Sequence, residues 1–250
     1  MICRTEKDYE GMRLAGKITG EALNYAKSLI KPNISTLELD KSIKKYIIDK
    51  GAIPSFLNYD GFPASICASV NSVVVHGIPS KDVILKEGDI ISIDVGVIIN
   101  GYNGDAARTF AVGKTTPACE KLIRITEECF FEGIKQLKVG AKIGEMSYAI
   151  QNHAECHGFS VVRELVGHGI GRKMHEAPEV PNYGLPSGGV RVKEGMCLAI
   201  EPMINMGERH IMVDTDGWGI LTRDGRPSAH YENTVIVTSN GVEITTLIEE

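Results

Sequence analysis

Apolar residues recur along this chain with two different spacings. Steps of three and four residues, which are typical of amphipathic helices, mark four segments of the chain. These segments are residues 5–30, 35–51, 116–137 and 144–157. The first two begin with the capping-box patterns Thr5 with Asp8 and Ser35 with Glu38, and the third has Pro117 at its first position. The chain therefore predicts two pairs of helices.

Alternation of apolar with other residues, which is typical of strands, marks several segments in the rest of the chain. The expected strands are Ala64–Val70, Val73–His76, a hairpin over Asp89–Phe110, Cys197–Ile204, Ile211–Val213, Trp218–Thr222, and a closing hairpin of Tyr231–Thr238 with Gly241–Thr245 about Asn240-Gly241. The Gly- and Pro-rich segment 167–189 is expected to be a long loop or a set of tight turns. Helices followed by strands, twice over, predict an α+β fold with two similar halves, whose helices cover a mostly antiparallel sheet. No linker divides the halves, so residues 1–250 are expected to form one domain.

The most regular alternation lies in the predicted hairpin. Asn100-Gly101 is a strong signal for a two-residue turn. Pairing across this turn puts Asp94 and Asp105 on the same sheet face as diagonal neighbours, about 7–8 Å apart, and puts Arg108 on the opposite face. Two carboxylates on one face of an apolar hairpin resist burial. They are either solvated surface groups or ligands of one or two metal ions, and the hairpin alone leaves both readings open.

Composition narrows the function classes. The 250 residues are 43% hydrophobic and 24% charged, with a net charge of −5 and no Lys/Arg block, so a nucleic-acid-binding surface is not expected. No apolar run is long enough to span a membrane, and the N-terminus has no secretory signal. The six cysteines are scattered without a C-x-x-C pair. This favours reduced thiols in the cytoplasm over disulfides or a zinc-thiolate site.

The second half of the chain adds further residues that commonly bind metals. Glu201 and Glu232 each interrupt an apolar strand, where an unpaired carboxylate is costly. His168 and His175 lie in a Gly-rich segment, and His76 ends an apolar strand. A set of acids with one or two histidines suits Mn, Fe, Co or Zn ions in a two-metal arrangement better than it suits a structural zinc ion.

Three other sequence features resemble functional motifs, but none of them favours a function. His153 and His157 lie one helical turn apart, but Glu155 is at the wrong offset for H-E-x-x-H, and histidines are favoured near a helix C-terminus. The GHGIG segment does not match the dinucleotide pattern G-x-G-x-x-G. No base can be placed beside Cys67, so a small apolar role is favoured over that of a nucleophile.

Five segments together resemble those of the type I methionine aminopeptidases in their short bacterial form, which have the pita-bread metallopeptidase fold. The segments are NSVVVHGIP, IDVGVIINGYNGDAARTF, GHGIGRKMHEAP, AIEPM and HYENTVIV, and the resemblance extends over residues 5–247. It implies that the chain removes the N-terminal methionine from nascent proteins and peptides with a small second residue. It further implies a cytoplasmic monomer whose partners are the N-termini of nascent polypeptides and the ribosome, with no nucleic-acid or membrane partner.

The resemblance also implies a role for individual residues. Asp94 would bind one of two divalent ions (Mn, Fe, Co or Zn), and Asp105 with Glu232 would bridge both. His168 and Glu201 would complete the ligand set of the second ion. Glu201 would also move a proton from the attacking water towards the leaving amine.

Around these ligands the resemblance implies further sites. His76 and His175 would contact the substrate, with His175 on the developing oxyanion and His76 on the peptide nitrogen. The methionine pocket would be lined by Tyr59, Phe62, Cys67, Met174 and Trp218. One Na or K ion would lie at Asn71, Val73 and Ser228. The chain departs from the family pattern at Asp60, Phe62 and Met174, where His, Tyr and Phe are frequent.

Two alternatives stay open at this point. A proline-directed peptidase would have the same fold, although such enzymes usually carry a further N-terminal domain that this sequence lacks. A binding module of the same fold that has lost its metals is a different class, and the complete ligand set argues against it.

Overall fold

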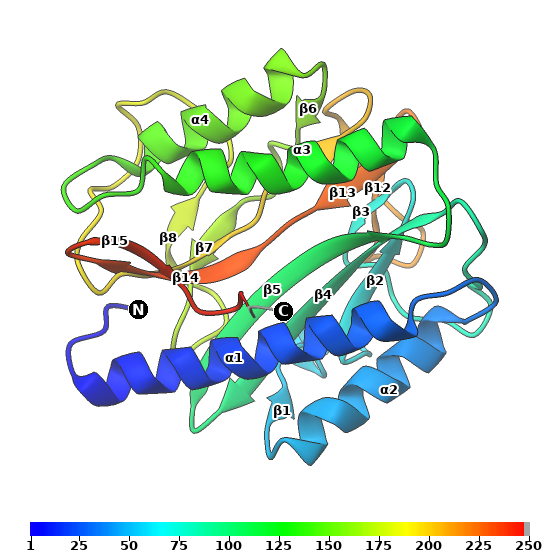
Figure 1. The fold of residues 1–250 in the computed structure, drawn as a ribbon, viewed down its shortest axis with the longest axis horizontal. Helices are drawn as coiled ribbons and strands as arrows, with labels where there is room; N and C mark the ends of the chain where they lie inside the picture. Colours follow the sequence, from blue (N-terminus) through cyan, green and yellow to red (C-terminus); the bar gives the residue numbers. More distant parts are fainter. Residues whose placement is uncertain (248–250) are drawn as a thin grey trace.

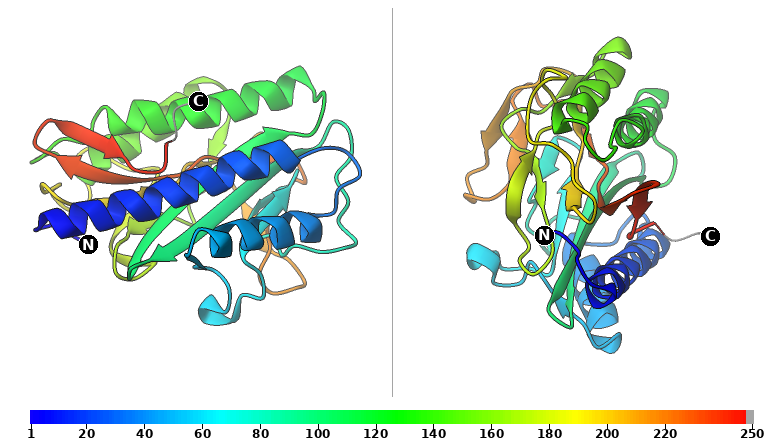
Figure 2. Two further views of the ribbon diagram at one scale, coloured as in Figure 1. Left: turned by 60° about the horizontal axis from the view of Figure 1, so that its bottom comes forward. Right: turned by 90° about the vertical axis from the view of Figure 1, so that its left-hand side faces the viewer.

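The computed structural model describes residues 1–247 of the chain. Two pairs of helices lie on the same side of the strands (Figure 1 and Figure 2). The pairs are α1 (Glu6–Leu29) with α2 (Thr36–Asp49), and α3 (Pro117–Ile134) with α4 (Ile143–Cys156). Thr5 and Ser35 form the two predicted capping boxes, so the sequence correctly located where these helices begin. No helix within residues 1–247 is long and apolar enough to cross a membrane.

The strands of residues 1–247 form four hydrogen-bonded sheets, and all their pairings are antiparallel. The first-half sheet contains β1 (Ile53–Pro54), β2 (Ile66–Val70), β4 (Ile90–Ile99) and β5 (Tyr102–Ala111). The five-stranded sheet of the second half has the order β15 (Gly241–Ile244), β14 (Asn233–Thr238), β9 (Cys197–Ile200), β7 (Gly167–Gly169) and β8 (Glu176–Val180). The two three-stranded sheets are β13 (Ser228–His230), β10 (Met203–Asn205) and β6 (Ser160–Val161), and β11 (Ile211–Val213), β12 (Ile220–Thr222) and β3 (Val73–Val75).

The β4–β5 hairpin has the register that the sequence predicts. Ile99 pairs with Tyr102, and Gly96 pairs with Asp105. Asn100 has a φ of 52° and Gly101 a φ of 74°, as a two-residue type I′ turn requires. The two aspartates of the hairpin therefore lie on one face.

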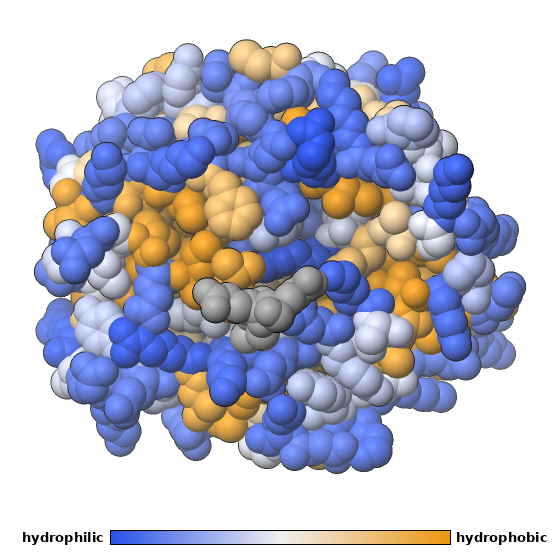
Figure 3. All heavy atoms as spheres, in the orientation of Figure 1, coloured by the Kyte–Doolittle hydropathy of each residue, from blue (hydrophilic) through white to orange (hydrophobic). Residues whose placement is uncertain are grey.

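The apolar residues of β4 decide which face this is. Ile91, Ile93, Val95 and Val97 are fully buried in one cluster with residues of α1 and α2. Because side chains alternate along a strand, Asp94 projects to the side away from these helices. The helix-covered side of the molecule, opposite to Asp94, faces the viewer in Figure 3. There hydrophilic side chains surround separate apolar patches.

The second half departs from the sequence expectation in two places. The segment 167–189 is not only loop, because β7 and β8 pair there and β7 also pairs with β9. These strands are short, and β7 is also held by the more distant strand β9, so a local alternation pattern does not reveal them. The single strand expected over Cys197–Ile204 is two strands, β9 and β10, because Pro202 has no N–H to continue a ladder.

Two further boundaries differ. The strand expected over Tyr231–Thr238 begins only at Asn233, and β13 precedes it. The closing hairpin pairs Thr238 with Gly241, so its turn is Ser239-Asn240 rather than Asn240-Gly241. The strands expected on either side of Asn71-Ser72 both exist, but β2 pairs with β4 and β3 pairs with β12.

Candidate metal centre

Four acidic side chains come together where the strands of the two halves meet. Asp94 lies in β4 and Asp105 in β5, whereas Glu201 directly follows β9 and Glu232 lies between β13 and β14. The backbone of Glu232 joins that of Ala107 in β5 through two hydrogen bonds of 2.9 and 3.3 Å. The acids of the second half therefore occupy strand breaks that face the hairpin of the first half.

His168 of β7 lies beside these acids. Its Nδ1 lies 2.9 Å from the backbone oxygen of Gly169. Because a carbonyl only accepts, Nδ1 carries the proton and Nε2 keeps a free lone pair. This Nε2 lies 3.7 Å from Asp105 Oδ2 and 3.9 Å from Glu201 Oε1. Burial lowers the pKa of His168 to about 4, which keeps the imidazole neutral and able to bind a metal.

Several carboxylate oxygens at this centre are buried and lack a partner among the described protein groups. Asp94 Oδ1, Asp105 Oδ1 and Glu232 Oε1 have no hydrogen-bond partner. Burial raises the pKa of Asp105 to about 7. Burial, and then the charge of Asp105, raise the pKa values of Asp94, Glu201 and Glu232 well above their usual range. Within residues 1–247 no lysine or arginine forms an ion pair with them.

Arg108, the cation nearest in sequence, faces the other way as predicted. Its guanidinium donates to the backbone oxygen of Glu232 and to Asn233 Oδ1, and it stacks 4.0 Å from the centre of the Tyr231 ring. The guanidinium thus holds the backbone at Glu232 from the face opposite to the carboxylates, and it forms no ion pair with them.

The donor set fits divalent metal ions. Two groups of ligand atoms each lie within 4.8 Å of one another, Asp94 with His230 and Glu232, and Asp105 with His168 and Glu232. Unpartnered buried carboxylates are costly, and cations relieve that cost. Oxygen-rich donors with imidazole suit Mn, Fe, Co or Zn ions.

A cavity of 290 Å³ opens above the acids. This volume is at the small end of ligand pockets, which measure about 300–1,000 Å³. The predicted site residues that line it are Tyr59, Phe62, Cys67, His76, Asp94, Asp105, His168, His175, Glu201, Trp218 and Glu232. Residues that the sequence did not point to also line it: Phe56, Val75, Leu165, Val166 and Met203. Apolar and aromatic walls over a polar floor suit a small ligand with an apolar end.

Aromatic and imidazole side chains contact one another at the cavity wall. Phe62 packs edge-on against Trp218 at a centroid distance of 5.2 Å. The hydroxyl of Tyr59 lies 2.8 Å from Nδ1 of His175. Burial lowers the pKa of His175, and burial with the nearby His175 lowers that of His76, so both histidines are neutral.

Met174 and Cys67, both predicted for the methionine pocket, differ in where they lie relative to the cavity. Met174 does not line the cavity; it is 3% exposed and packs in a core cluster with Tyr102 and Ile170. Cys67 lines the cavity, but burial and the charge of Asp94 raise its thiol pKa well above its usual range. Cys67 is therefore a wall residue and not a thiolate nucleophile, as the sequence favoured.

The residues suggested for a monovalent ion lie where the turn between β2 and β3 meets β13. The N–H of Ser228 donates to the backbone oxygen of Asn71 at 2.9 Å. Val73 begins β3 and pairs with Leu221. The structure thus brings Asn71 and Ser228 into direct contact, with Val73 two residues along the chain.

His230 is the polar residue at this centre that sequence reasoning missed. Its side chain is 2% exposed, and both ring nitrogens lack a hydrogen-bond partner. Nε2 lies 3.8 Å from Glu201 Oε2 and 3.8 Å from Glu232 Oε2. Burial lowers its pKa to about 3, so the ring is neutral. The signal in the sequence was its place two residues before Glu232, on a stretch whose alternate side chains share one face.

Two helix-covered antiparallel halves that share a buried cluster of acids and a histidine define a metal-dependent hydrolase of the pita-bread fold. The model of metallopeptidase family M24 matches residues 10–239. The chain belongs to this family.

Known proteins extend the similarity to the whole chain. The methionine aminopeptidase of Clostridium perfringens is 53% identical over 249 residues and is covered fully, as is this chain. The crystal structure of methionine aminopeptidase from Rickettsia prowazekii has a TM-score of 0.96 at 46% identity, covering 99% of this chain and 100% of that one. The structure of the enzyme from Thermotoga maritima has a TM-score of 0.97 at 41% identity, with the same coverage. The resemblance to methionine aminopeptidases that the five sequence segments indicated is confirmed, as is the predicted fold class.

Proposed function

We propose that this protein is a methionyl aminopeptidase that removes the N-terminal methionine from nascent proteins and peptides with a small second residue. The observation that carries the proposal is the cluster of Asp94, Asp105, His168, Glu201 and Glu232 at the floor of a small apolar cavity. The relatives of similar length that bear the name methionine aminopeptidase support it. Its partners would be the N-termini of nascent polypeptides presented at the ribosome, and the single domain would act as a monomer in the cytoplasm.

The five donors would hold two divalent ions, Mn, Fe, Co or Zn. Asp94 would bind one of them, Asp105 and Glu232 would bridge the pair, and His168 with Glu201 would bind the second. Such ions lower the pKa of water held between them and so supply hydroxide near neutral pH. A Na or K ion at Asn71, Val73 and Ser228 would stabilise the nearby strand ends.

The side chains around the ions would orient the substrate and move the proton. Glu201 would take a proton from the attacking water and deliver it to the leaving amine. When the Tyr59 hydroxyl donates to Nδ1 of His175, Nε2 of that ring carries the proton and can donate to the developing oxyanion. The left-handed backbone of His76 (φ of 59°), directly after β3, turns its side chain into the cavity. There the ring would accept a hydrogen bond from the peptide N–H of the substrate.

The cavity walls would select the first residue. Tyr59, Phe62, Cys67 and Trp218 surround space for an unbranched apolar side chain, and Met174 would support this wall from the core. A charged first residue would lose its hydration there without gaining a partner, and a longer one would clash.

Peptide cleavage tests this function directly. We expect Met-Ala-Ser to be cleaved at the first bond, and Lys-Ala-Ser and an X-Pro dipeptide to be cleaved roughly 100-fold more slowly or not at all. Initial rates with the metal-reconstituted protein measure this. Faster turnover of the X-Pro peptide would reassign the chain to the proline-directed peptidases. Metal binding without turnover of any peptide would favour a binding module.

His230 is expected to act as a positioning residue for Glu201 and Glu232. His230→Leu removes an imidazole whose Nε2 lies 3.8 Å from an oxygen of each of these two carboxylates, so we expect a 10- to 100-fold weaker metal affinity and a lower kcat, the range seen for groups that orient ligands. His230→Gln keeps an N–H donor and should retain most of both. Metal titration and steady-state kinetics on the two variants measure this. Equal behaviour of the Leu and Gln variants would show that the ring only fills space.

A further inference from the structure

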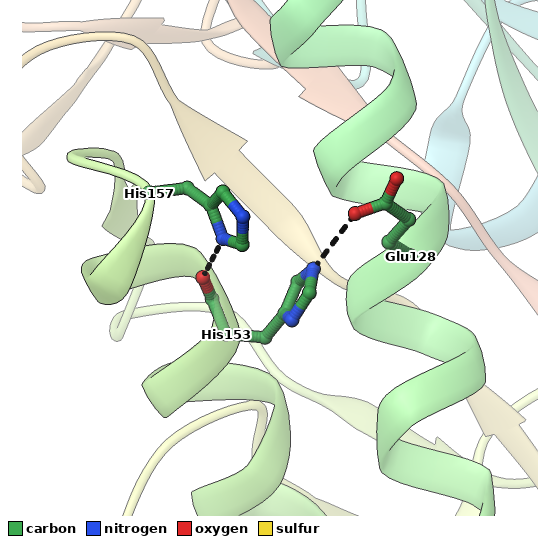
Figure 4. Close-up of side chains that lie close together, drawn as sticks. All are labelled: Glu128, His153 and His157. Carbon is green, nitrogen blue, oxygen red and sulfur yellow. Dashed lines mark hydrogen bonds and ion pairs between the residues drawn. The ribbon is translucent and has the colours of Figure 1, made fainter.

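A second group of metal-binding side chains lies between α3 and α4, outside the catalytic cavity. His153 and His157 come from the last turn and the C-cap of α4, and Glu128 faces them from α3 (Figure 4). One ligand atom of each residue lies within 4.8 Å of the others. All three side chains are partly exposed, so ions in solution can reach them. None of them lines the cavity above the acids.

The imidazole of His157 is held in the form that binds metals. Its Nδ1 lies 2.8 Å from the backbone oxygen of His153. Since a carbonyl only accepts, Nδ1 carries the proton and Nε2 has a free lone pair. Figure 4 shows this second nitrogen facing the carboxylate of Glu128. A hydrogen bond from the far nitrogen is how metal-bound histidines are usually oriented.

The other two ligands are already close together. His153 Nε2 lies 3.0 Å from Glu128 Oε2. Ligands at zinc-bond lengths on a tetrahedron lie about 3.3 Å apart. Arg124 pairs with the other carboxylate oxygen, Oε1, and so fixes the group while leaving Oε2 for an ion. The rings of His153 and His157 are 4.5 Å apart and tilted by 47°, and a ligand atom of each ring lies within 4.8 Å of a Glu128 oxygen.

We propose that Glu128, His153 and His157 form a site for one zinc-class divalent ion, with water as the fourth ligand. Two imidazoles and one carboxylate favour Zn, Ni or Cu over Mn, which prefers oxygen ligands. An ion there joins α3 to α4 and is separate from the catalytic ions. The inference does not depend on the proposed peptidase activity, because no residue of the site takes part in it.

Zinc counting with matched variants tests the site. Full-length protein, Glu128→Gln and His153→Gln are dialysed to equilibrium against the same low-micromolar free zinc, with His210→Gln as the control histidine from another surface. We expect each of the two site variants to bind one zinc ion per chain fewer than wild type, and His210→Gln to bind the wild-type number. Peptidase turnover with Mn should be the same in all four proteins. Equal zinc counts in wild type and the site variants would overturn the proposal.

A crystal soaked in zinc provides an independent measurement. We expect an anomalous difference peak about 2.0–2.2 Å from His153 Nε2, His157 Nε2 and Glu128 Oε2. An empty site in such a crystal, with zinc present at the catalytic acids, would also overturn the proposal.

Discussion

Asp105→Asn is expected to lower peptidase turnover about 1,000-fold or more and to remove bound metal at the same time. Asp105 lies at the centre of the buried acids, 3.7 Å from His168, and would bridge both ions. An amide has one neutral oxygen and cannot bridge two cations as a carboxylate does. Several kcal/mol of transition-state stabilisation depend on such ions, and each 1.36 kcal/mol corresponds to a tenfold change in rate.

Loss of folding must be separated from loss of metal in this experiment. Asp105 is 4% exposed and its pKa is raised to about 7 by burial, so a neutral amide relieves a buried charge in the metal-free protein. The metal-free variant should therefore unfold at the same temperature as metal-free wild type or above it. Asp82→Asn, at an exposed position, is the matched control and should leave rate and metal content unchanged. Full activity and metal content in Asp105→Asn would refute the assignment of the metal centre.

Removing the metals from the wild-type protein is expected to abolish turnover reversibly. The described residues around the cavity offer neutral histidines and a protonated Cys67 thiol, and none of these is an activated nucleophile. Chelation followed by dialysis should leave no measurable cleavage of Met-Ala-Ser. Adding back Mn, Fe, Co or Zn one at a time should restore it, and the ranking identifies the metals that support catalysis.

The unfolding temperature provides a second measurement of the effect of metal removal. The ions would bind the native state and relieve the repulsion among four closely spaced carboxylates. A ligand at 100 times its Kd adds about 2.7 kcal/mol to the free energy of unfolding. Chelation should therefore lower the unfolding temperature of wild type, and lower that of Asp105→Asn much less. Undiminished turnover by protein shown to be free of metal would contradict the proposed mechanism.

Local signals in the sequence were sufficient for the helix starts and the central hairpin. A capping box involves four consecutive residues, and an Asn-Gly turn sets the register of the strands beside it. The predicted pairing of Gly96 with Asp105 could thus be stated before the fold was known, and it is confirmed. The resemblance of five short segments indicated the family for the same reason, since each segment is recognisable by itself.

Contacts between distant segments could not be obtained in this way. The pairing of β7 with β9, the core in which Met174 packs and the burial of His230 all depend on contacts between elements far apart in the chain. Glu128 lies 25 residues before His153 in the sequence, and it joins the two histidines only because α3 packs on α4.

For this protein, the sequence by itself determined the helices, the face on which Asp94 and Asp105 lie, and the family. These features depend on backbone geometry over a few residues, or on motifs that are continuous in the chain. The tertiary structure alone decided that four acids and two histidines lie together, and that no arginine or lysine of residues 1–247 forms an ion pair with these acids. Burial is a property of the packed chain, and burial gives these carboxylates their need for metal ions.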